Sequence, residues 1–202
     1  MGTQSRVFIK GEGKAWLDRN INKLDGNNDP VLETLKACKI TPANVIEVGC
    51  ANGWRLAKLA KEFNCNGFGV DPGAERQVNK GFSIFNGTAE LLPFTSASAD
   101  VVIYGFCLYL CDPEDYFKIA AEGDRVLQNN GYLVVYDFNC PIGSYKTKYK
   151  HHGGIFSYHY DFSRLWMGNP AYSNYGRKVF GNEGDETSVT VLKKSNACFP
   201  VK

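Results

Sequence analysis

The sequence predicts an α/β fold, a doubly wound and mostly parallel sheet that ends in an antiparallel C-terminal hairpin. Short apolar runs alternate with helical patterns between residues 30 and 138. The run 101–106 (VVIYGF) is continuously apolar, which is typical of a parallel strand covered on both faces. Because strand–helix–strand crossovers are right-handed, successive units place helices on both faces of one sheet.

Two helices are predicted before the first strand. Residues 12–20 (EGKAWLDRN) form a short helix anchored by Trp16. Residues 30–39 (PVLETLKACK) have a more regular helical pattern. Asp29 can accept a hydrogen bond from a free backbone N–H of its first turn, and Pro30 suits the first helical position.

Five apolar or alternating runs are the predicted parallel strands: 44–50, 67–71, 82–87, 101–106 and 132–138. A helix follows the first of them, because Leu56 and Leu59 recur at helical spacing. Another begins at Asp112 and Pro113 and runs to about Leu127, with acidic residues in its first turn. This alternation of strands and helices indicates a sheet with helices on both faces.

The last part of the chain has a different pattern. Residues 177–180 and 187–194 flank the turn-rich sequence GNEGDE, which predicts a hairpin and hence at least one antiparallel strand. Between Phe138 and Arg177 the sequence is rich in aromatic residues, His and Gly. No regular structure is predicted there.

Composition limits the partners. The 202 residues include 23 Lys and Arg against 21 Asp and Glu, a net charge of +2, so no strong field attracts nucleic acid or an anionic membrane. No apolar run approaches the ~18 residues of a membrane helix. The seven cysteines contain no C-x-x-C, which disfavours a disulfide framework and a zinc site. We expect a cytoplasmic protein with free thiols, and neither nucleic acid nor a membrane as partner.

The residues at the strand ends predict a nucleotide-like ligand, because open α/β sheets bind ligands outside the carboxyl ends of their strands. Gly49 and Gly53 follow the first strand, where glycines let the backbone turn tightly and approach a ligand. Asp71 ends the second strand, and its carboxylate can accept both hydroxyls of a ribose. NAD is a weaker alternative, because its G-x-G-x-x-G fingerprint is not present in this loop.

The segments EVGCANG, VDPG, GTAELLPF, ADVVIYGFCLYL and VLQNNGYLVVYDF follow one another between roughly residues 40 and 140. Together they resemble the class I S-adenosylmethionine-dependent methyltransferases, especially the branch that acts on small molecules. The resemblance implies a Rossmann-like methyltransferase fold with a seven-stranded sheet. It also implies S-adenosyl-L-methionine as the cofactor.

The resemblance further implies a role for each matching position. Glu47 would be linked to the cofactor's amino end, and the loop that holds the methionine part would contain Gly49, Cys50 and Gly53. Asp71 would bind the ribose, and Thr88 and Ala89 would lie beside adenine. Gly105 and Phe106 would face the methionine amine. Thr88 stands where the family more often has Asp. No metal site is implied.

All three histidines, His151, His152 and His159, lie within nine residues and are the candidate general bases. Asp161 could orient one of them. Alternatively the histidines are structural or solvated, or two of them form a metal site with Asp161. A base is needed only if the methyl acceptor is a hydroxyl of high pKa.

Aromatic side chains with polar tips suit a flat or sugar-like ligand, so the substrate wall is predicted where they cluster. The candidate substrate-binding residues are Trp16, Arg19, Tyr109, Tyr145, Tyr158 and Tyr160. The cluster could instead be a satellite core or the face of a homodimer.

One domain is expected over 1–202, with these parts: a lid at 1–29, a cofactor-binding core at 30–140, a substrate-side segment at 141–176 and the hairpin at 177–202.

The activity expected from these features is methyl transfer from S-adenosylmethionine to a small molecule. An oxygen of a sugar-like or phosphorylated acceptor from a glycan pathway is the first expectation. N-methylation of a small metabolite is an alternative, and a non-catalytic cofactor-binding module is another. Turnover of the cofactor would separate the enzymes from the binding module.

Overall fold

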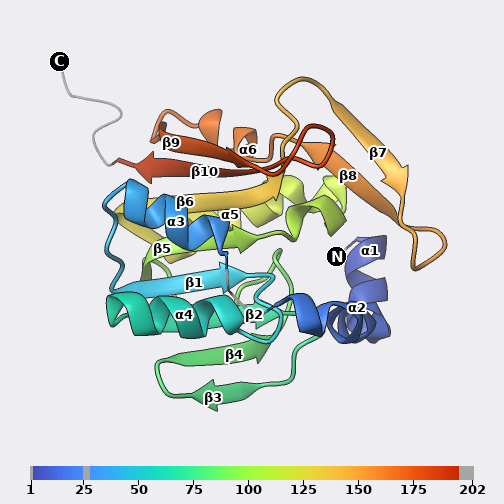
Figure 1. Ribbon diagram of the computed structural model, residues 1–202, viewed down its shortest axis with the longest axis horizontal. Helices are drawn as coiled ribbons and strands as arrows, with labels where there is room; N and C mark the ends of the chain where they lie inside the picture. Colours follow the sequence, from blue (N-terminus) through green and yellow to red (C-terminus); the bar gives the residue numbers. More distant parts are fainter. Residues whose placement is uncertain (1, 25–27, 196–202) are drawn as a thin grey trace.

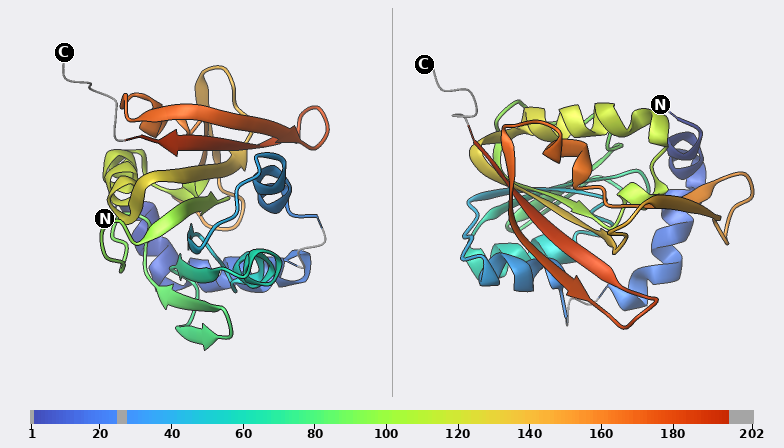
Figure 2. Two further views of the ribbon diagram at one scale, coloured as in Figure 1. Left: turned by 90° about the vertical axis from the view of Figure 1, so that its left-hand side faces the viewer. Right: turned by 90° about the horizontal axis from the view of Figure 1, so that it is seen from above.

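A twisted sheet lies between two layers of helices in the computed structural model, which describes residues 2–24 and 28–195 (Figures 1 and 2). Its strands are β1 (Asn44–Val48), β2 (Asn66–Asp71), β3 (Gln77–Asn79), β4 (Phe82–Asn86), β5 (Ala99–Gly105), β6 (Leu127–Phe138), β9 (Tyr172–Phe180) and β10 (Thr187–Lys194). They are ordered β3-β4-β2-β1-β5-β6-β10-β9. The strands β4, β2, β1, β5 and β6 are parallel to their neighbours within this group, as predicted.

The antiparallel C-terminal hairpin is confirmed, since β10 pairs antiparallel with both β6 and β9. The expected number of seven strands is wrong by one. The described residues give this sheet an eighth strand, β3, which pairs antiparallel with β4 in the register Val78↔Ser83. All three residues of β3 are exposed, so the strand has no apolar pattern by which the sequence could have predicted it.

The helices cover both faces of the sheet. They are α1 (Thr3–Val7), α2 (Gly13–Asn20), α3 (Pro30–Ala37), α4 (Trp54–Phe63), α5 (Tyr116–Val126) and α6 (Arg164–Met167), with a π-helix η1 (Phe8–Glu12) and the 3-10 turns η2 (Ile21–Lys23), η3 (Leu108–Leu110) and η4 (Pro113–Asp115). One core lies beneath α3 and α4, and the other lies beneath α5 and α6. The right-hand view of Figure 2 shows these layers on opposite sides of the sheet.

The two cores explain the apolar run of β5. Every residue from Val101 to Gly105 is buried, since alternate side chains enter the two cores. The Tyr104 ring packs 5.0 Å from the ring of Trp166 on α6. The Trp166 Nε1–H donates to the carbonyl of Ala120 at 3.0 Å, so α6 is fixed to α5 by a buried hydrogen bond.

The segment without predicted structure contains a second, two-stranded sheet. Its strands β7 (Ser144–Lys148) and β8 (Phe156–Tyr160) pair antiparallel, with Tyr145 opposite His159. All of β7 is exposed, so this strand has no buried face to produce an apolar alternation. The β7–β8 hairpin projects beside the N-terminal helices at the end of the main sheet (Figure 1).

The N-terminal segment is helical over a longer range than expected. The predicted helix at 12–20 corresponds to α2, and α1 and η1 precede it. The next helix, α3, also agrees with the prediction, because the Val31 N–H donates to Asp29 at 3.2 Å. The start of α1 is fixed to the loop after β5, where Asp112 accepts the N–H of Gln4 at 2.8 Å and Asp115 accepts that of Gly2 at 2.7 Å.

Candidate active site

A cavity of about 670 Å³, including the space at its mouth, lies at the carboxyl ends of β1, β2, β4 and β5. The N-terminal helices cover it. Its lining residues are Ser5, Phe8, Gly13, Trp16, Val48, Gly49, Val70, Asp71, Pro72, Gly87, Thr88, Ala89, Glu90, Phe106, Cys107, Leu110 and Cys111. The predicted cofactor residues Gly49, Asp71, Thr88, Ala89 and Phe106 therefore meet at one cavity, and their contact with a cofactor stays a prediction.

Gly49 and Asp71 have the geometry expected of ligand-facing positions. Gly49 has φ +75°, and a Cβ on it would lie 2.5 Å from the Cβ of Cys107. The Asp71 carboxylate accepts the N–H of Ala51 at 3.0 Å and that of Gly73 at 2.8 Å. Burial raises the pKa of Asp71, and these backbone N–H groups oppose that rise. Each oxygen keeps acceptor capacity for a ribose hydroxyl.

The other four predicted cofactor residues, Glu47, Cys50, Gly53 and Gly105, lie behind the cavity wall. Gly53 has φ +77° at the start of α4 and packs against Phe82. The Cys50 thiol packs against Gly69. A Cβ on Gly105 would lie 2.5 Å from Glu47 Oε1. These positions shape the loops, and direct contact between them and a ligand stays a prediction.

Glu47 belongs to a buried ionic cluster. Arg55 donates hydrogen bonds to Glu47 and, at 3.0 Å, to Asp29. Burial raises the pKa of Glu47 to about 7, although the guanidinium of Arg55 opposes this rise. Arg55 also lies 4.5 Å from the Trp54 ring centroid and 5.5 Å from that of Tyr136. Arg55 bonds Oε1 of Glu47, whereas Oε2 has no hydrogen-bond partner among the residues that the structure describes. The predicted link of Glu47 to the amino end of a cofactor therefore stays a prediction.

The charge of the cavity lining is negative. Its titratable acids are Asp71 and Glu90, and no Lys or Arg is among the lining residues. Glu90 is 2% exposed, and its Oε1 has no hydrogen-bond partner among the residues that the structure describes. Such a cavity favours a ligand that carries positive charge and N–H or O–H donors. It disfavours a phosphate.

The lid is formed by α1, η1 and α2, which contribute Ser5, Phe8, Gly13 and Trp16 to the lining. Gly13 and Gly73 bring two backbones into contact. A Cβ on Gly13 would lie 2.7 Å from the nitrogen of Gly73, a distance that side chains do not adopt. Two facing glycines therefore allow α2 to close onto the loop after β2.

The wall beside Phe106 is aromatic. Phe106 has φ +60°, which is rare for a residue with a side chain. Its ring lies 5.0 Å from Tyr109 and 4.8 Å from Phe138. The buried carboxylate of Asp137 accepts the N–H of Tyr109 at 3.2 Å and that of Phe138 at 2.9 Å. Asp137 therefore holds the loop that presents Phe106 and Tyr109.

The structure divides the predicted substrate residues into two groups. In the first group, Trp16 lines the cavity, Tyr109 packs against the lining residue Phe106, and Arg19 lies on the same helix as Trp16, α2. Arg19 pairs with the buried Glu12, and Tyr149 donates to the same carboxylate at 2.9 Å. The second group, Tyr145, Tyr158 and Tyr160, lines a separate open groove of about 900 Å³ between the β7–β8 hairpin and the start of α5.

The candidate histidines lie in two parts of the β7–β8 hairpin, a strand and the connecting loop. His159 stacks on Tyr145 at 4.4 Å and its Nε2 lies 3.1 Å from the hydroxyl of Ser157. Burial lowers its pKa. His151 and His152 are exposed in the loop between β7 and β8. None of the three lines the cofactor cavity, so a role as general base stays a prediction.

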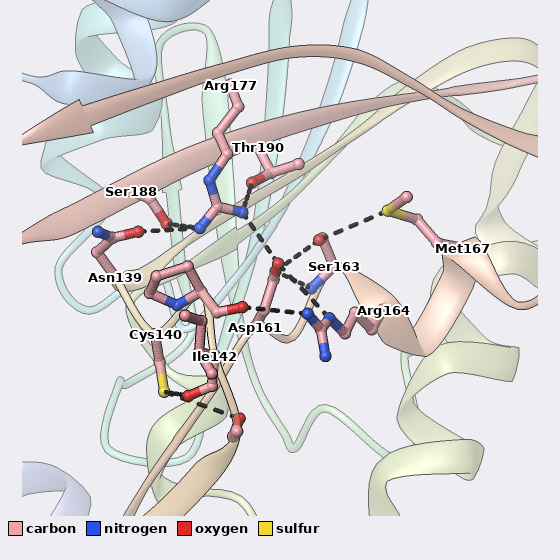
Figure 3. Close-up of polar contacts among 12 residues, drawn as sticks. Asn139, Cys140, Ile142, Asp161, Ser163, Arg164, Met167, Arg177, Ser188 and Thr190 are labelled. Carbon is pink, nitrogen blue, oxygen red and sulfur yellow. Dashed lines mark hydrogen bonds and ion pairs between the residues drawn. The ribbon is translucent and has the colours of Figure 1, made fainter.

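Asp161 lies in a different network from the histidines (Figure 3). Its carboxylate accepts from Arg177 at 3.1 Å and from the hydroxyl of Ser163 at 2.6 Å. Arg177 also donates to Asn139 at 2.9 Å. These bonds join the segment after β8 to β9 and to the end of β6. The interpretation of Asp161 as an orienter of a histidine therefore finds no support in its contacts.

The remaining sequence expectations concern metals, thiols and membranes. Within 2–24 and 28–195, no group of three or more His, Cys, Asp or Glu is arranged to hold a metal. Six cysteines in this range are free thiols, and Cys198 lies outside the described residues. No helix of the described chain has both the length and the apolar character needed to span a bilayer.

Comparison with protein families gives a match at the centre of the chain. Residues 46–135 match a family model described as a methyltransferase domain. An uncharacterized protein of Haemophilus influenzae is 35% identical over 104 residues, which are 46% of this chain and 41% of that protein. The alignment thus spans less than half the length of this curated relative.

Comparison with solved structures extends over most of the chain. The 1,6-didemethyltoxoflavin-N1-methyltransferase of Burkholderia thailandensis, with S-adenosylhomocysteine bound, has a TM-score of 0.74 at 16% identity and covers 89% of this chain and 83% of its own. The N-methyltransferase NodS of Bradyrhizobium japonicum, in complex with S-adenosylhomocysteine, has a TM-score of 0.61 at 13% identity over 90% and 98%. At these identities the likeness shows the fold, and the predicted Rossmann-like methyltransferase fold is confirmed.

Proposed function

We propose that this chain is a class I methyltransferase, which binds S-adenosylmethionine in the cavity beneath the lid and transfers its methyl group to a small molecule. The single observation that carries the proposal is the charge of the cavity. Asp71 and Glu90 line it, and no basic side chain does. The cofactor has a cationic sulfonium, an ammonium group, a ribose diol and an amine on its base, so it matches such a lining.

The loop after β1 argues against the NAD alternative. Its glycines are spaced Gly49-x-x-x-Gly53, whereas a dinucleotide's pyrophosphate is held at a helix N-terminus by a G-x-G-x-x-G loop. Asp71 does not separate the two cofactors, because a carboxylate at the end of this strand can bind the ribose of either.

Each residue has a defined part in the proposed mechanism. Asp71 would accept the ribose hydroxyls, and Gly49 would allow close approach of the methionine part. When bound, the cofactor would supply a methyl group on a positively charged sulfur, and the sulfur would leave as the neutral thioether of S-adenosylhomocysteine when the methyl passes to the acceptor. The lid residues Phe8 and Trp16 exclude water, while Phe106 and Tyr109 orient the acceptor's ring.

We further propose that the acceptor is flat and uncharged. The wall beside Phe106 consists of aromatic rings, which stack on planar groups. Among the described residues that line the cavity there is no Lys or Arg to hold a phosphate, and Arg19 on α2 already pairs with Glu12. An oxygen of a sugar-like acceptor and a ring nitrogen are both compatible with the aromatic wall, and the likeness to the toxoflavin N1-methyltransferase favours the nitrogen.

Calorimetry with S-adenosylhomocysteine tests the cofactor site. We expect the wild-type protein to bind it and Asp71→Ala to weaken binding at least about tenfold, since two hydrogen bonds to a carboxylate are lost. Asp185→Ala, which alters an exposed aspartate in the turn between β9 and β10, is the matched control. Unchanged affinity in Asp71→Ala would refute the ribose assignment.

Turnover tests the activity. The protein, S-adenosylmethionine and a panel of planar nitrogen heterocycles, phenols and sugars would be assayed for S-adenosylhomocysteine. Product with at least one acceptor supports the enzyme. Cofactor binding without product from any acceptor would favour the non-catalytic binding module.

A further inference from the structure

We propose that the groove between the β7–β8 hairpin and the start of α5 is the interface of a two-fold symmetric homodimer. In this dimer the first turn of α5 in each copy lies in the groove of the other copy. The proposal concerns the surface of the chain and depends neither on the proposed activity nor on a bound ligand. It gives a partner to aromatic residues that do not reach the cofactor cavity.

The rims of the groove carry large apolar side chains that no described residue covers. Phe117 on α5 is 83% exposed, and Ile142 and Tyr145 at the start of the hairpin are 88% and 57% exposed. Every residue from Pro141 to Lys148 is exposed, and the hairpin projects from the rest of the molecule (Figure 1). Exposed apolar surface that gathers around one groove marks an interaction site. A partner seated there would bury these side chains.

The walls of the groove are rigid. Tyr145 stacks on His159 with the ring centroids 4.4 Å apart and the planes 8° apart. The His159 ring lies in turn 4.4 Å from Phe138 at the end of β6. On the opposite wall, Tyr116 packs edge-on against Phe162 at 5.5 Å. Because both walls are held in place before association, little conformational entropy is lost when a side chain of a partner enters.

The two walls carry opposite charges. Lys146 lines the groove from the hairpin, and Glu114 is exposed on the α5 side, three residues before Phe117. Lys146 lies 4.2 Å from the centroid of the Phe156 ring. Neither Lys146 nor Glu114 forms an ion pair with another residue that the structure describes. The hairpin wall therefore fits an element with an apolar ring beside a carboxylate.

A second copy of the chain supplies that element. Phe117 and Glu114 are three residues apart, so one face of the first turn of α5 presents both. An isologous interface needs both halves of each contact on one surface, and here the hairpin and the start of α5 are opposite walls of one groove. Across the dimer the order is hairpin, partner's α5, α5 and partner's hairpin. Each Lys146 then faces a Glu114 of the other copy.

Direct pairing of the two β7 edges is the competing arrangement. The strand has five exposed residues and pairs with β8 alone among the described strands. Antiparallel pairing with a second β7 would bring Lys146 and Lys148 of both copies into one narrow strip. Like charges that face each other across strands are destabilising, and lysines on an edge strand oppose such pairing. The charges therefore favour the groove over the edge.

Sedimentation velocity on the full chain without ligand tests the interface. We expect the wild type to be dimeric at about 100 µM, a concentration that populates a dimer with a micromolar dissociation constant. Phe117→Ser should raise the dissociation constant at least about tenfold, because buried aromatic side chains dominate the energy of interfaces. Val78→Ser is the control, since it removes an apolar side chain that is 77% exposed on the edge strand β3, and it should leave the dissociation constant unchanged.

Charge reversal tests which side chains face each other. Lys146→Glu and Glu114→Lys should each raise the dissociation constant at least about fivefold, because each places like charges across the interface. The double variant restores opposite charges and should associate within about twofold of the wild type. Lys61→Glu, at an exposed position of α4 in the other helix layer, controls for the change in net charge.

The contrary outcomes are distinct. A wild-type chain that stays monomeric at about 100 µM would overturn the proposal. A dimer that Phe117→Ser leaves unchanged would also overturn it, because another surface would then hold the copies together. If the double charge reversal did not restore association, Lys146 would not face Glu114, and the two-fold arrangement would be wrong.

Discussion

The contact between Gly13 and Gly73 makes a quantitative prediction about the lid. In Gly73→Ala, the new Cβ would lie 2.6 Å from the nitrogen of Lys14 and closer still to the Gly13 carbonyl group. All these atoms belong to the backbone of α2, so no side chain can move aside. The lid must therefore separate from the loop after β2, although the rest of the fold can stay as it is.

The magnitude follows from the cost of overpacking. Forcing an extra methyl group into a closely packed contact costs about 1–3 kcal/mol. If only the closed lid binds the cofactor, this cost reduces the population of the binding-competent state, and the apparent affinity falls by the same factor. We expect Gly73→Ala to weaken binding of S-adenosylhomocysteine by about 5- to 150-fold.

Calorimetry on three single variants and one double variant separates the possible causes. Gly73 donates its N–H to Asp71, so Gly73→Ala alone could act through that carboxylate. Gly13→Ala alters the same contact from the other side, and the effects of the two substitutions should not add in the double variant. Gly168→Ala is the control, since nothing lies within 4 Å of a Cβ at that position. If Gly73→Ala bound within twofold of the wild type, the lid would not need this contact.

The remaining predictions concern stability and the base. Burial raises the pKa of Asp137 to about 7. Between about pH 4 and 7 the folded state therefore holds a proton that the unfolded state releases. As pH rises through this window, the free energy of unfolding falls by at most about 1.4 kcal/mol per pH unit. Asp137→Asn should flatten that part of the stability curve in urea unfolding, and identical slopes would contradict the reasoning. Trp166→Phe should cost about 1–3 kcal/mol in the same assay, because the carbonyl of Ala120 loses its buried donor. Each histidine changed singly to Ala should retain turnover if the acceptor needs no base, and loss of turnover in one of them would identify the base.

The sequence predicted best those helices and strands whose order of apolar and polar residues reflects which side chains are buried. The continuous apolar run of β5 corresponds to a strand between two cores, and Asp29 caps α3 because its chemistry is local. The β7–β8 hairpin could not be predicted in this way. Its outer strand has no buried face, and β8 is held by a tertiary contact, in which the N–H of Phe156 donates to Gln4 at 2.6 Å.

The residues of the candidate site were predictable where the topology of the sheet alone determines their position. Gly49 and Asp71 stand at strand ends, where topology alone brings them together. Glu90, which also lines the cavity, was not predicted, because a glutamate in a turn is normally solvated, whereas this one is 2% exposed. The histidines cluster in sequence, but His159 lies within β8, the other two lie in the loop before it, and none of them lines the cavity. Their clustering along the chain therefore did not predict a place at the cavity.

The contacts of Gln4 have a consequence for how a ligand leaves. Its side chain donates to the carbonyl of Leu110 at 2.7 Å and accepts from the N–H of Phe156, positions that are 106 and 152 residues away. Residues 2–13 lie near the chain terminus and cover a cavity, and terminal or lid segments of this kind open by local unfolding at lower free energy than core strands and helices. We expect the exit of a bound nucleoside to be timed by this opening. The residence time would then report the local stability of residues 2–13, and amide hydrogen exchange in that segment should slow when the cavity is filled.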